Sequence, residues 1–165
     1  MTLLQATHMD SPRPFWEQTP LDNMTPTQWE QLCDGCGLCC LNKLEDEETG
    51  EIYLTRVACN LLDKCSSQCS DYTNRFTRVP DCTQITPEIA KTAPWLPSSC
   101  AYRRLAHGKK LLPWHPLISE QPDSVSKAGI AVGNKVIHEA ELGENEYADF
   151  IVSEESLISV YLEKE

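Results

Sequence analysis

The stretch of sequence that decides the fold is Cys33-Asp34-Gly35-Cys36-Gly37-Leu38-Cys39-Cys40. Two residues separate Cys33 from Cys36, and two residues separate Cys36 from Cys39. The glycines permit tight turns, and Gly37 can take a positive φ, so that backbone N–H groups point at the sulfur atoms. Cysteines at this spacing are typical of turns that present thiolates to a metal ion. The pattern indicates metal binding and says nothing about which metal is bound.

The adjacent pair Cys39 and Cys40 bears on how many metal centres there are. Neighbouring side chains of an extended backbone face opposite sides, so the two thiols are not expected to share one tetrahedral ion. The spacing of the three cysteines that precede Cys40 also matches the start of the ligand motif of bacterial ferredoxins. In that motif the fourth cysteine lies further along the chain, whereas here Cys40 follows directly. We therefore expect two metal centres or one polynuclear centre. The alternative is a redox dithiol or a group of buried small residues.

The remaining cysteines give a ligand count. Cys59, Cys69 and Cys82 are crowded into 24 residues, which favours ligation, and nine thiols would fill two four-coordinate sites with one left over. His115 lies between Trp114 and Pro116 and is open to three interpretations: a ligand, an acid or base, or a structural histidine. No catalytic residue is assigned. The predicted ligands are Cys33, Cys36, Cys39, Cys40, Cys59, Cys69 and Cys82, with Cys65 and Cys100 in reserve.

Composition excludes several classes of protein. The chain has 165 residues and a net charge of -11, and a surface this acidic disfavours nucleic-acid binding. No stretch has the length and apolar character of a membrane span, and Met1–Trp16 lacks the basic start and apolar run of a signal peptide. We expect a cytoplasmic protein with no membrane or nucleic-acid partner. An odd number of cysteines in a reducing compartment favours metal over disulfides.

Local patterns predict a small, irregular α+β single domain with short helices, a β-hairpin and cysteine loops held by metal. Thr25-Pro26 and Thr86-Pro87 match helix starts, a third helix follows Ser98, and residues 41–55 match a hairpin with an acidic tip. Extended backbone is expected at 114–117, and short strands at 129–132, 135–137 and 150–152. The expected organisation is an N-terminal arm (1–24), a cysteine-cluster metal-binding domain (25–137) and an acidic C-terminal tail (138–165).

Several motifs together resemble one known family. They are residues 33–40, Gly50-Glu51-Ile52-Tyr53, Val57-Ala58-Cys59, Asp71-Tyr72, Pro80-Asp81-Cys82, Trp95-Leu96-Pro97, Cys100-Ala101-Tyr102-Arg103 and Trp114-His115-Pro116-Leu117. On these residues the chain resembles the bacterial zinc- or iron-chelating CxxCxxCC family, specifically its YcgN-like branch. The resemblance spans most of residues 15–150. It implies binding of zinc, iron or an iron–sulfur cluster, and it implies no reaction, substrate or protein partner.

Three functional hypotheses follow from these patterns. The leading one is a metal-binding protein that holds zinc or iron. The second is an oxidoreductase or electron carrier that depends on an iron–sulfur cluster. The third is a zinc-stabilised interaction module without catalysis, whose acidic surface would meet a basic partner. A substrate pocket with convergent polar groups beside the metal would separate the second from the others.

Overall fold

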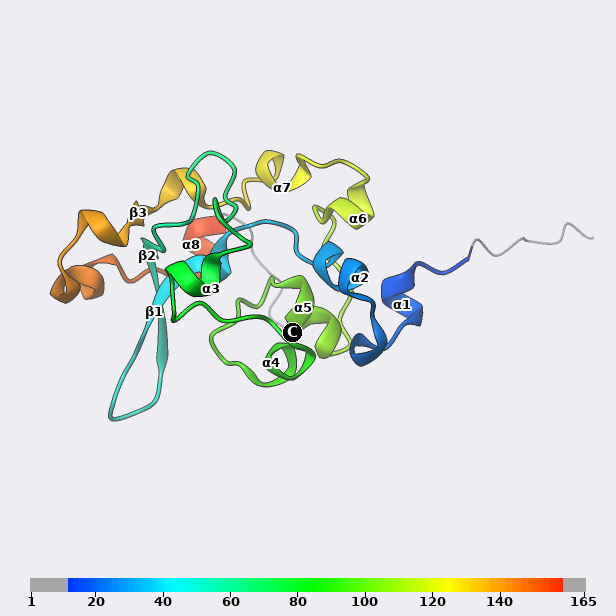
Figure 1. Cartoon of the computed structure of the whole chain (residues 1–165), viewed down its shortest axis with the longest axis horizontal. Helices are drawn as coiled ribbons and strands as arrows, with labels where there is room; N and C mark the ends of the chain where they lie inside the picture. Colours follow the sequence, from blue (N-terminus) through cyan, green and yellow to red (C-terminus); the bar gives the residue numbers. More distant parts are fainter. Residues whose placement is uncertain (1–11, 159–165) are drawn as a thin grey trace, which may run out of the picture.

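The computed structural model describes residues 12–158, in which short helices surround a small sheet (Figure 1). The strands are β1 Leu41–Glu45, β2 Ile52–Ala58 and β3 Ile137–His138. The α-helices are α1 Phe15–Gln18, α2 Pro26–Gln31, α3 Arg75–Arg78, α4 Pro87–Thr92, α5 Ala101–Ala106, α6 Pro116–Ser119, α7 Ser124–Lys127 and α8 Glu154–Ile158. Turns of 3₁₀ type cover Leu21–Asn23, Leu38–Cys40, Gly133–Lys135, Glu139–Glu141 and Glu144–Phe150.

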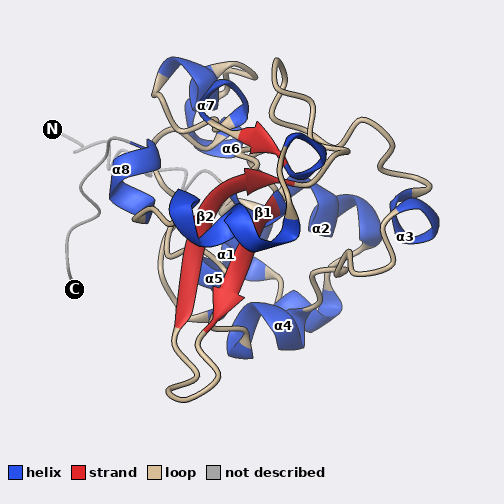
Figure 2. Ribbon diagram, turned by 90° about the vertical axis from the view of Figure 1, so that its left-hand side faces the viewer, coloured by secondary structure: helices blue, strands red, loops and turns tan. Residues whose placement is uncertain are grey.

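The sheet is built on the predicted hairpin. Its order is β1-β2-β3, with β1 antiparallel and β3 parallel to β2, and the ladder is irregular between Leu41 and Lys43. The tip of the hairpin projects beyond the rest of the chain (Figure 2). There the carboxylate of Asp46 accepts hydrogen bonds from the backbone N–H groups of Glu48 at 2.9 Å and Thr49 at 2.8 Å. These bonds close the acidic tip locally, as expected of a solvated turn.

Helix starts follow the capping chemistry read from the sequence. The Thr25 hydroxyl accepts a hydrogen bond from the Gln28 N–H at 3.2 Å, and the Gln28 side chain accepts one from the Thr25 N–H at 2.9 Å. This reciprocal box begins α2. Thr86 caps α4 through a bond of 3.2 Å from the Ile89 N–H. The α2 cap fixes the start of the helix that leads into Cys33.

Two groups of buried apolar side chains form the interior. The first collects residues from two distant stretches, 38–62 and 125–158: Leu38, Leu41, Ala58, Leu62, Val125, Ile130, Val132, Leu157 and Ile158. The second is centred on Leu32, Ala90 and Tyr102, and Phe15, Trp16 and Leu21 pack against it. The apolar interior is thus divided into two small cores.

The predicted α+β class with short helices and a hairpin is confirmed. Some elements differ from expectation. Pro116 begins α6, so residues 114–117 are not extended throughout, because the imidazole of His115 accepts the Leu117 N–H and caps the turn. In 129–137 only Ile137 belongs to a strand, and near 150–152 a single bridge joins Ile151 to Thr55.

The division into arm, domain and tail stays a prediction, and residues 1–11 and 159–165 lie outside the described residues. Within the described part, α8 places Leu157 and Ile158 in the first core, where they are 4% and 0% exposed. No helix between residues 12 and 158 is long and apolar enough to span a bilayer.

Candidate metal centre

The turn Cys33–Cys40 is built by its two glycines. Gly35 and Gly37 have φ values of +75° and +84°, and the Asp34 carboxylate accepts the Cys36 N–H at 3.1 Å. Only glycine adopts this left-handed backbone at little cost. The positive φ predicted for Gly37 is confirmed. The extended backbone expected at Cys39 and Cys40 is wrong, because Leu38–Cys40 is a 3₁₀ turn that begins at Gly37.

Backbone N–H groups face several of the sulfur atoms. The Leu61 N–H lies 3.5 Å from Cys59 Sγ, and the N–H groups of Gly35 and Leu38 likewise donate to the thiols of Cys33 and Cys36. Each donor stands two residues after its cysteine. Such bonds favour the thiolate over the thiol, so the turns are shaped for charged sulfur ligands.

The loop that carries Cys65 and Cys69 packs directly on the first turn. A Cβ added at Gly37 would lie 2.9 Å from the backbone oxygen of Ser67, so no side chain fits there. The Ser67 hydroxyl accepts the Gly133 N–H at 2.8 Å and is buried in this contact. The absence of a side chain at Gly37 therefore lets two cysteine-bearing segments meet.

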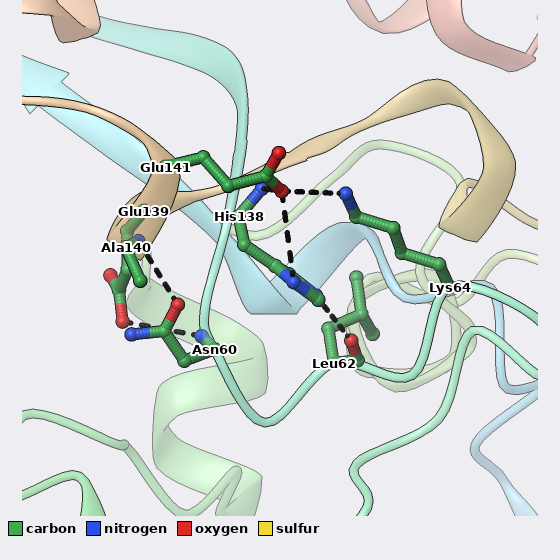
Figure 3. A network of polar contacts seen from close by, with 7 residues as sticks. All are labelled: Asn60, Leu62, Lys64, His138, Glu139, Ala140 and Glu141. Atoms are coloured by element: carbon green, nitrogen blue, oxygen red, sulfur yellow. Dashed lines mark hydrogen bonds and ion pairs between the residues drawn. The ribbon is translucent and has the colours of Figure 1, made fainter.

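A polar network holds the segment that follows Cys59 (Figure 3). The Glu139 carboxylate accepts the Asn60 N–H at 3.2 Å, and the Asn60 side chain accepts the Ala140 N–H at 3.1 Å. A ring nitrogen of His138 lies 2.7 Å from the Leu62 oxygen. Lys64 and Glu141 add an ion pair of 2.7 Å between half-exposed side chains. The turn after β3 thus anchors the backbone between Cys59 and Cys65.

These segments enclose one cavity of about 460 Å³ between the two cores. Leu41 and Leu62 of the first core line it, as do Leu32 and Tyr102 of the second. Eight of the nine cysteines line it as well: Cys33, Cys36, Cys39, Cys40, Cys59, Cys69, Cys82 and Cys100. Cys65 is exposed and lies outside the cavity, whereas the reserve candidate Cys100 belongs to it.

Most of the electrostatic contacts among the eight thiols fall within two sets of four. In the first, the Cys100 group, Cys39 acts on Cys33, Cys36 and Cys100. In the second, the Cys59 group, Cys59 acts on Cys40, and Cys69 acts on both Cys59 and Cys82. The Cys100 group comprises Cys33, Cys36, Cys39 and Cys100, and the Cys59 group comprises Cys40, Cys59, Cys69 and Cys82. Cys39 joins the two groups, because it acts on both Cys40 and Cys82 of the Cys59 group.

Most of the thiols are held protonated in the protein without metal. Burial raises the pKa of Cys33 to about 12 and that of Cys100 to about 11. The pKa of Cys39 is shifted in the opposite direction: a hydrogen bond from the Cys40 thiol lowers it to about 7 and raises that of Cys40. The side chains of Cys33 and Cys39 are nevertheless exposed to solvent. Protein atoms lie around both thiols, but solvent reaches them through the open cavity that they line. A metal ion that enters must displace protons from these thiols.

Among the described residues that line the cavity, acidic side chains outnumber basic ones. The acidic residues are Glu30, Asp34, Asp81 and Glu139, and the basic residues are Lys43 and Arg75. Lys43 donates hydrogen bonds to the carbonyls of Leu38 at 3.0 Å and Cys39 at 3.1 Å. It therefore braces the 3₁₀ turn from the neighbouring strand. The excess of carboxylates and thiols favours a cation as the occupant.

The eight thiols line one cavity, but their side chains are not grouped as a metal site. Within residues 12–158, no group of three or more Cys, His, Asp or Glu side chains has the arrangement of a finished metal site. The donor set nevertheless fits zinc or iron, because thiolate sulfur is the preferred ligand of four-coordinate zinc and of iron–sulfur clusters.

His115 has a structural position. It is 2% exposed, its Nε2 lies 2.9 Å from the Leu32 oxygen, and its Nδ1 accepts the Leu117 N–H at 3.0 Å. A nitrogen that accepts an N–H carries no proton, so the proton is on Nε2 and is donated to Leu32. Both ring nitrogens are used, and the imidazole fixes the residue that precedes Cys33.

Sequence reasoning missed the residues that support the thiols. Glu139 and Glu154 reach the cysteine segments only through tertiary contacts, whereas Lys43 bonds to carbonyls four and five residues before it. Glu139 and Glu154 stand in a stretch so rich in acidic residues that the sequence gives no reason to single them out. Lys43 offered a weak signal, as a basic residue three positions after Cys40.

The fold and its thiol-lined cavity define a small cysteine-cluster protein of the metal-chelating class. The profile of the family described as "Putative zinc- or iron-chelating domain" matches residues 32–101, which contain all nine cysteines. The chain is 52% identical over 139 residues to a UPF0260 protein of Rhizorhabdus wittichii, covering 84% of this chain and 95% of that one.

Two further UPF0260 proteins are similar over most of their length. That of Mesorhizobium japonicum is 51% identical over 144 residues, or 86% of this chain and 97% of the relative. That of Shewanella frigidimarina is 56% identical over 125 residues, or 76% and 84%. The chain belongs to the bacterial UPF0260 family, which confirms the resemblance drawn from its motifs. No solved structure matches it. The family description supports metal binding and does not distinguish zinc from iron.

Proposed function

We propose that the chain binds zinc or iron through eight cysteines that form two adjacent four-thiolate sites. The observation that carries this proposal is the convergence of eight cysteines, drawn from residues 33–100, on one cavity of about 460 Å³. The Cys100 group would hold one ion and the Cys59 group the other. Four thiolates per ion is the usual ligand set of a structural zinc site.

The adjacent cysteines support the two-site arrangement. Cys39 is assigned to the Cys100 group because it interacts with all three of its other members, whereas Cys40 interacts with Cys59. In the Cys59 group, Cys39 acts on Cys82 as well as on Cys40. The Cys59 N–H also donates to the Cys40 carbonyl at 3.0 Å, which keeps these two segments together. The 3₁₀ turn thus delivers consecutive thiols to neighbouring centres.

The second candidate is an iron–sulfur protein that carries electrons or acts as an oxidoreductase. The hydrogen bond between the thiols of Cys39 and Cys40 favours it, because it brings the two groups close enough for one polynuclear centre. The exposure of Cys33 and Cys39 to the cavity opening would place such a centre near solvent.

Anaerobic purification followed by metal and sulfide analysis and an absorption spectrum tests both candidates. Two zinc ions per chain and a colourless protein support the first. Iron, acid-labile sulfide and visible charge-transfer bands support the second. A preparation that contains neither metal, and takes up neither after reduction, contradicts both. Cys65→Ser is the matched control: its thiol lies outside the cavity, so the variant should keep the parent's metal content.

A further inference from the structure

One carboxylate receives four hydrogen bonds from a single short segment. Glu154 Oε2 accepts the N–H and the hydroxyl of Ser98, both at 3.0 Å. Its Oε1 accepts the N–H of Ser99 at 3.0 Å and the hydroxyl at 2.6 Å. Each serine gives both of its donors, and both carboxylate oxygens are used. Bonds to a charged acceptor are stronger than neutral ones, so this contact fixes the segment firmly.

The segment held in this way leads directly into Cys100. Ser99 is 4% exposed, and Cys100 follows it at the N-cap position of α5. Cys100 lines the thiol cavity, yet it stands 60 residues after Cys40 and outside the run of closely spaced cysteines. The position of its thiol therefore depends on how the 98–99 backbone is held.

The other end of α8 is anchored beneath the first cysteine turn. Leu157 and Ile158 are buried in the same core as Leu38, which begins the turn that carries Cys39 and Cys40. Lys135 adds a hydrogen bond of 2.5 Å to the Leu157 carbonyl. α8 thus connects the core beneath Cys39 with the backbone before Cys100. These two cysteines belong to the same proposed four-thiolate site.

We propose that Glu154 is a positioning residue for Cys100, through which the C-terminal helix α8 completes the Cys100 group of the metal centre. This inference rests on the proposed function, since it takes Cys100 as a ligand. The carboxylate acts through Ser98 and Ser99 and does not itself bind the ion. Partners of this kind, one step removed from the metal, typically change metal affinity by about 10- to 100-fold when they are altered.

The test compares Glu154→Gln with Glu155→Gln in the full chain. An amide can accept hydrogen bonds only through its single oxygen, so Glu154→Gln disrupts the four-bond contact while keeping the size of the side chain. Glu155 is the matched control, because it is the exposed neighbour on the same helix. The probe is Co²⁺ under anaerobic conditions, followed by thiolate-to-cobalt absorption. We expect Glu154→Gln to bind Co²⁺ about 10-fold more weakly or worse, and Glu155→Gln to match the parent.

A double variant separates positioning from a general loss of structure. If Glu154 acts through Cys100, Glu154→Gln should cause no further loss of Co²⁺ affinity in a Cys100→Ser background. An equal loss in both backgrounds overturns the proposal, as does parent-like binding by Glu154→Gln in the native background.

A metal-independent readout distinguishes this inference from the proposed function. In the metal-free chain, the alkylation rate of Cys100, mapped by mass spectrometry, should rise several-fold in Glu154→Gln and stay unchanged in Glu155→Gln. If the parent binds no Co²⁺ but this difference is found, positioning stands and the proposed function fails. If the parent binds Co²⁺ and the two variants behave alike in both assays, the proposed function stands and the role of Glu154 is wrong.

Discussion

A hydrogen bond between the thiols of Cys39 and Cys40 lowers the pKa of Cys39 to about 7 and raises that of Cys40, and this contact is one of two that link the four-thiol groups. It arises because Leu38–Cys40 forms a 3₁₀ turn, in which consecutive side chains do not point to opposite sides as they do in a strand. The two residues are therefore neighbours in space, but Cys39 interacts mainly with the Cys100 group, whereas Cys40 interacts with Cys59.

This arrangement predicts that Cys39→Ser and Cys40→Ser lose different ions. A serine hydroxyl stays protonated near neutral pH and binds zinc or iron weakly, so each variant should lose about one of two ions per chain. Metal analysis of the two variants and the Cys39→Ser/Cys40→Ser double variant checks this. If the double variant loses no more metal than either single one, the two cysteines serve one shared centre. Full metal content in both single variants means that neither is a ligand.

Gly37→Ala should destabilise the chain through a steric contact at the cysteine turn. The new Cβ would meet the Ser67 oxygen at 2.9 Å and Val132 Cγ2 at 3.1 Å, at a backbone φ of +84°. Strain of this kind costs on the order of 1–3 kcal/mol, and the clash adds to it. Gly108→Ala is the matched control, since φ there is +71° but nothing lies within 4 Å of the added Cβ. Denaturant unfolding of both variants should show the larger loss at Gly37.

The sequence predicted local features whose causes are local. The capping box at Thr25, the positive φ at Gly37 and the hairpin over residues 41–55 depend on residues close together in the chain, and all three are present. The nine candidate ligands could be named in the same way. Their roles as ligands stay predictions.

What the sequence did not reveal depends on contacts between distant segments. Cys100 could be placed beside Cys39, and Cys65 outside the cavity, only once the fold had brought residues 33–100 together. The acidic composition after residue 138 gives no indication of two structural features of this stretch. Leu157 and Ile158 are core residues, and Glu139 and Glu154 hold cysteine loops through hydrogen bonds. Net charge describes the surface of such a segment and not the side of it that packs.

Leu157→Ala tests whether the C-terminal helix is part of the core. The side chain is 4% exposed, and truncation of a buried leucine costs about 2–5 kcal/mol. Glu155→Ala, an exposed substitution on the same helix, should stay within about 0.5 kcal/mol of the parent. Chemical unfolding curves give both values. The acidic composition of residues 153–165 by itself predicts a solvated end, and equal stability of the two variants would support that view over the buried helix.

His115→Phe should weaken the fold without removing a ligand. The change leaves the buried Leu32 carbonyl and Leu117 N–H without their partner, which costs about 1–3 kcal/mol for each unsatisfied group. Metal content per folded chain should equal that of the parent, because both ring nitrogens are engaged with the backbone. Thermal unfolding and metal analysis of the same sample check the two parts. Loss of an ion from a variant that still folds would make His115 a ligand.

Without metal, the stability of the chain should fall as pH rises above about 9. The thiols of Cys33 and Cys100 have folded-state pKa values of about 12 and about 11, compared with 9.0 for an unperturbed thiol. A group whose pKa is raised by folding stabilises the folded state below the unfolded value, and this stabilisation is lost as pH approaches the folded value. Between pH 9 and about 12 the unfolded chain therefore releases protons that the folded chain keeps.

The pKa of Cys39 is shifted in the opposite direction, so this thiol affects stability over a different pH range. Its folded-state pKa of about 7 means that its contribution grows between pH 7 and 9 and is constant above that. Melting temperatures of the reduced, chelator-treated chain should therefore decline from pH 9 upward, and the decline should be shallower in Cys33→Ser, which has one raised thiol fewer. A parent and a Cys33→Ser variant with parallel profiles would show that Cys33 is not held protonated. Because bound metal replaces these protons, the metal-loaded chain should show a weaker decline over the same range.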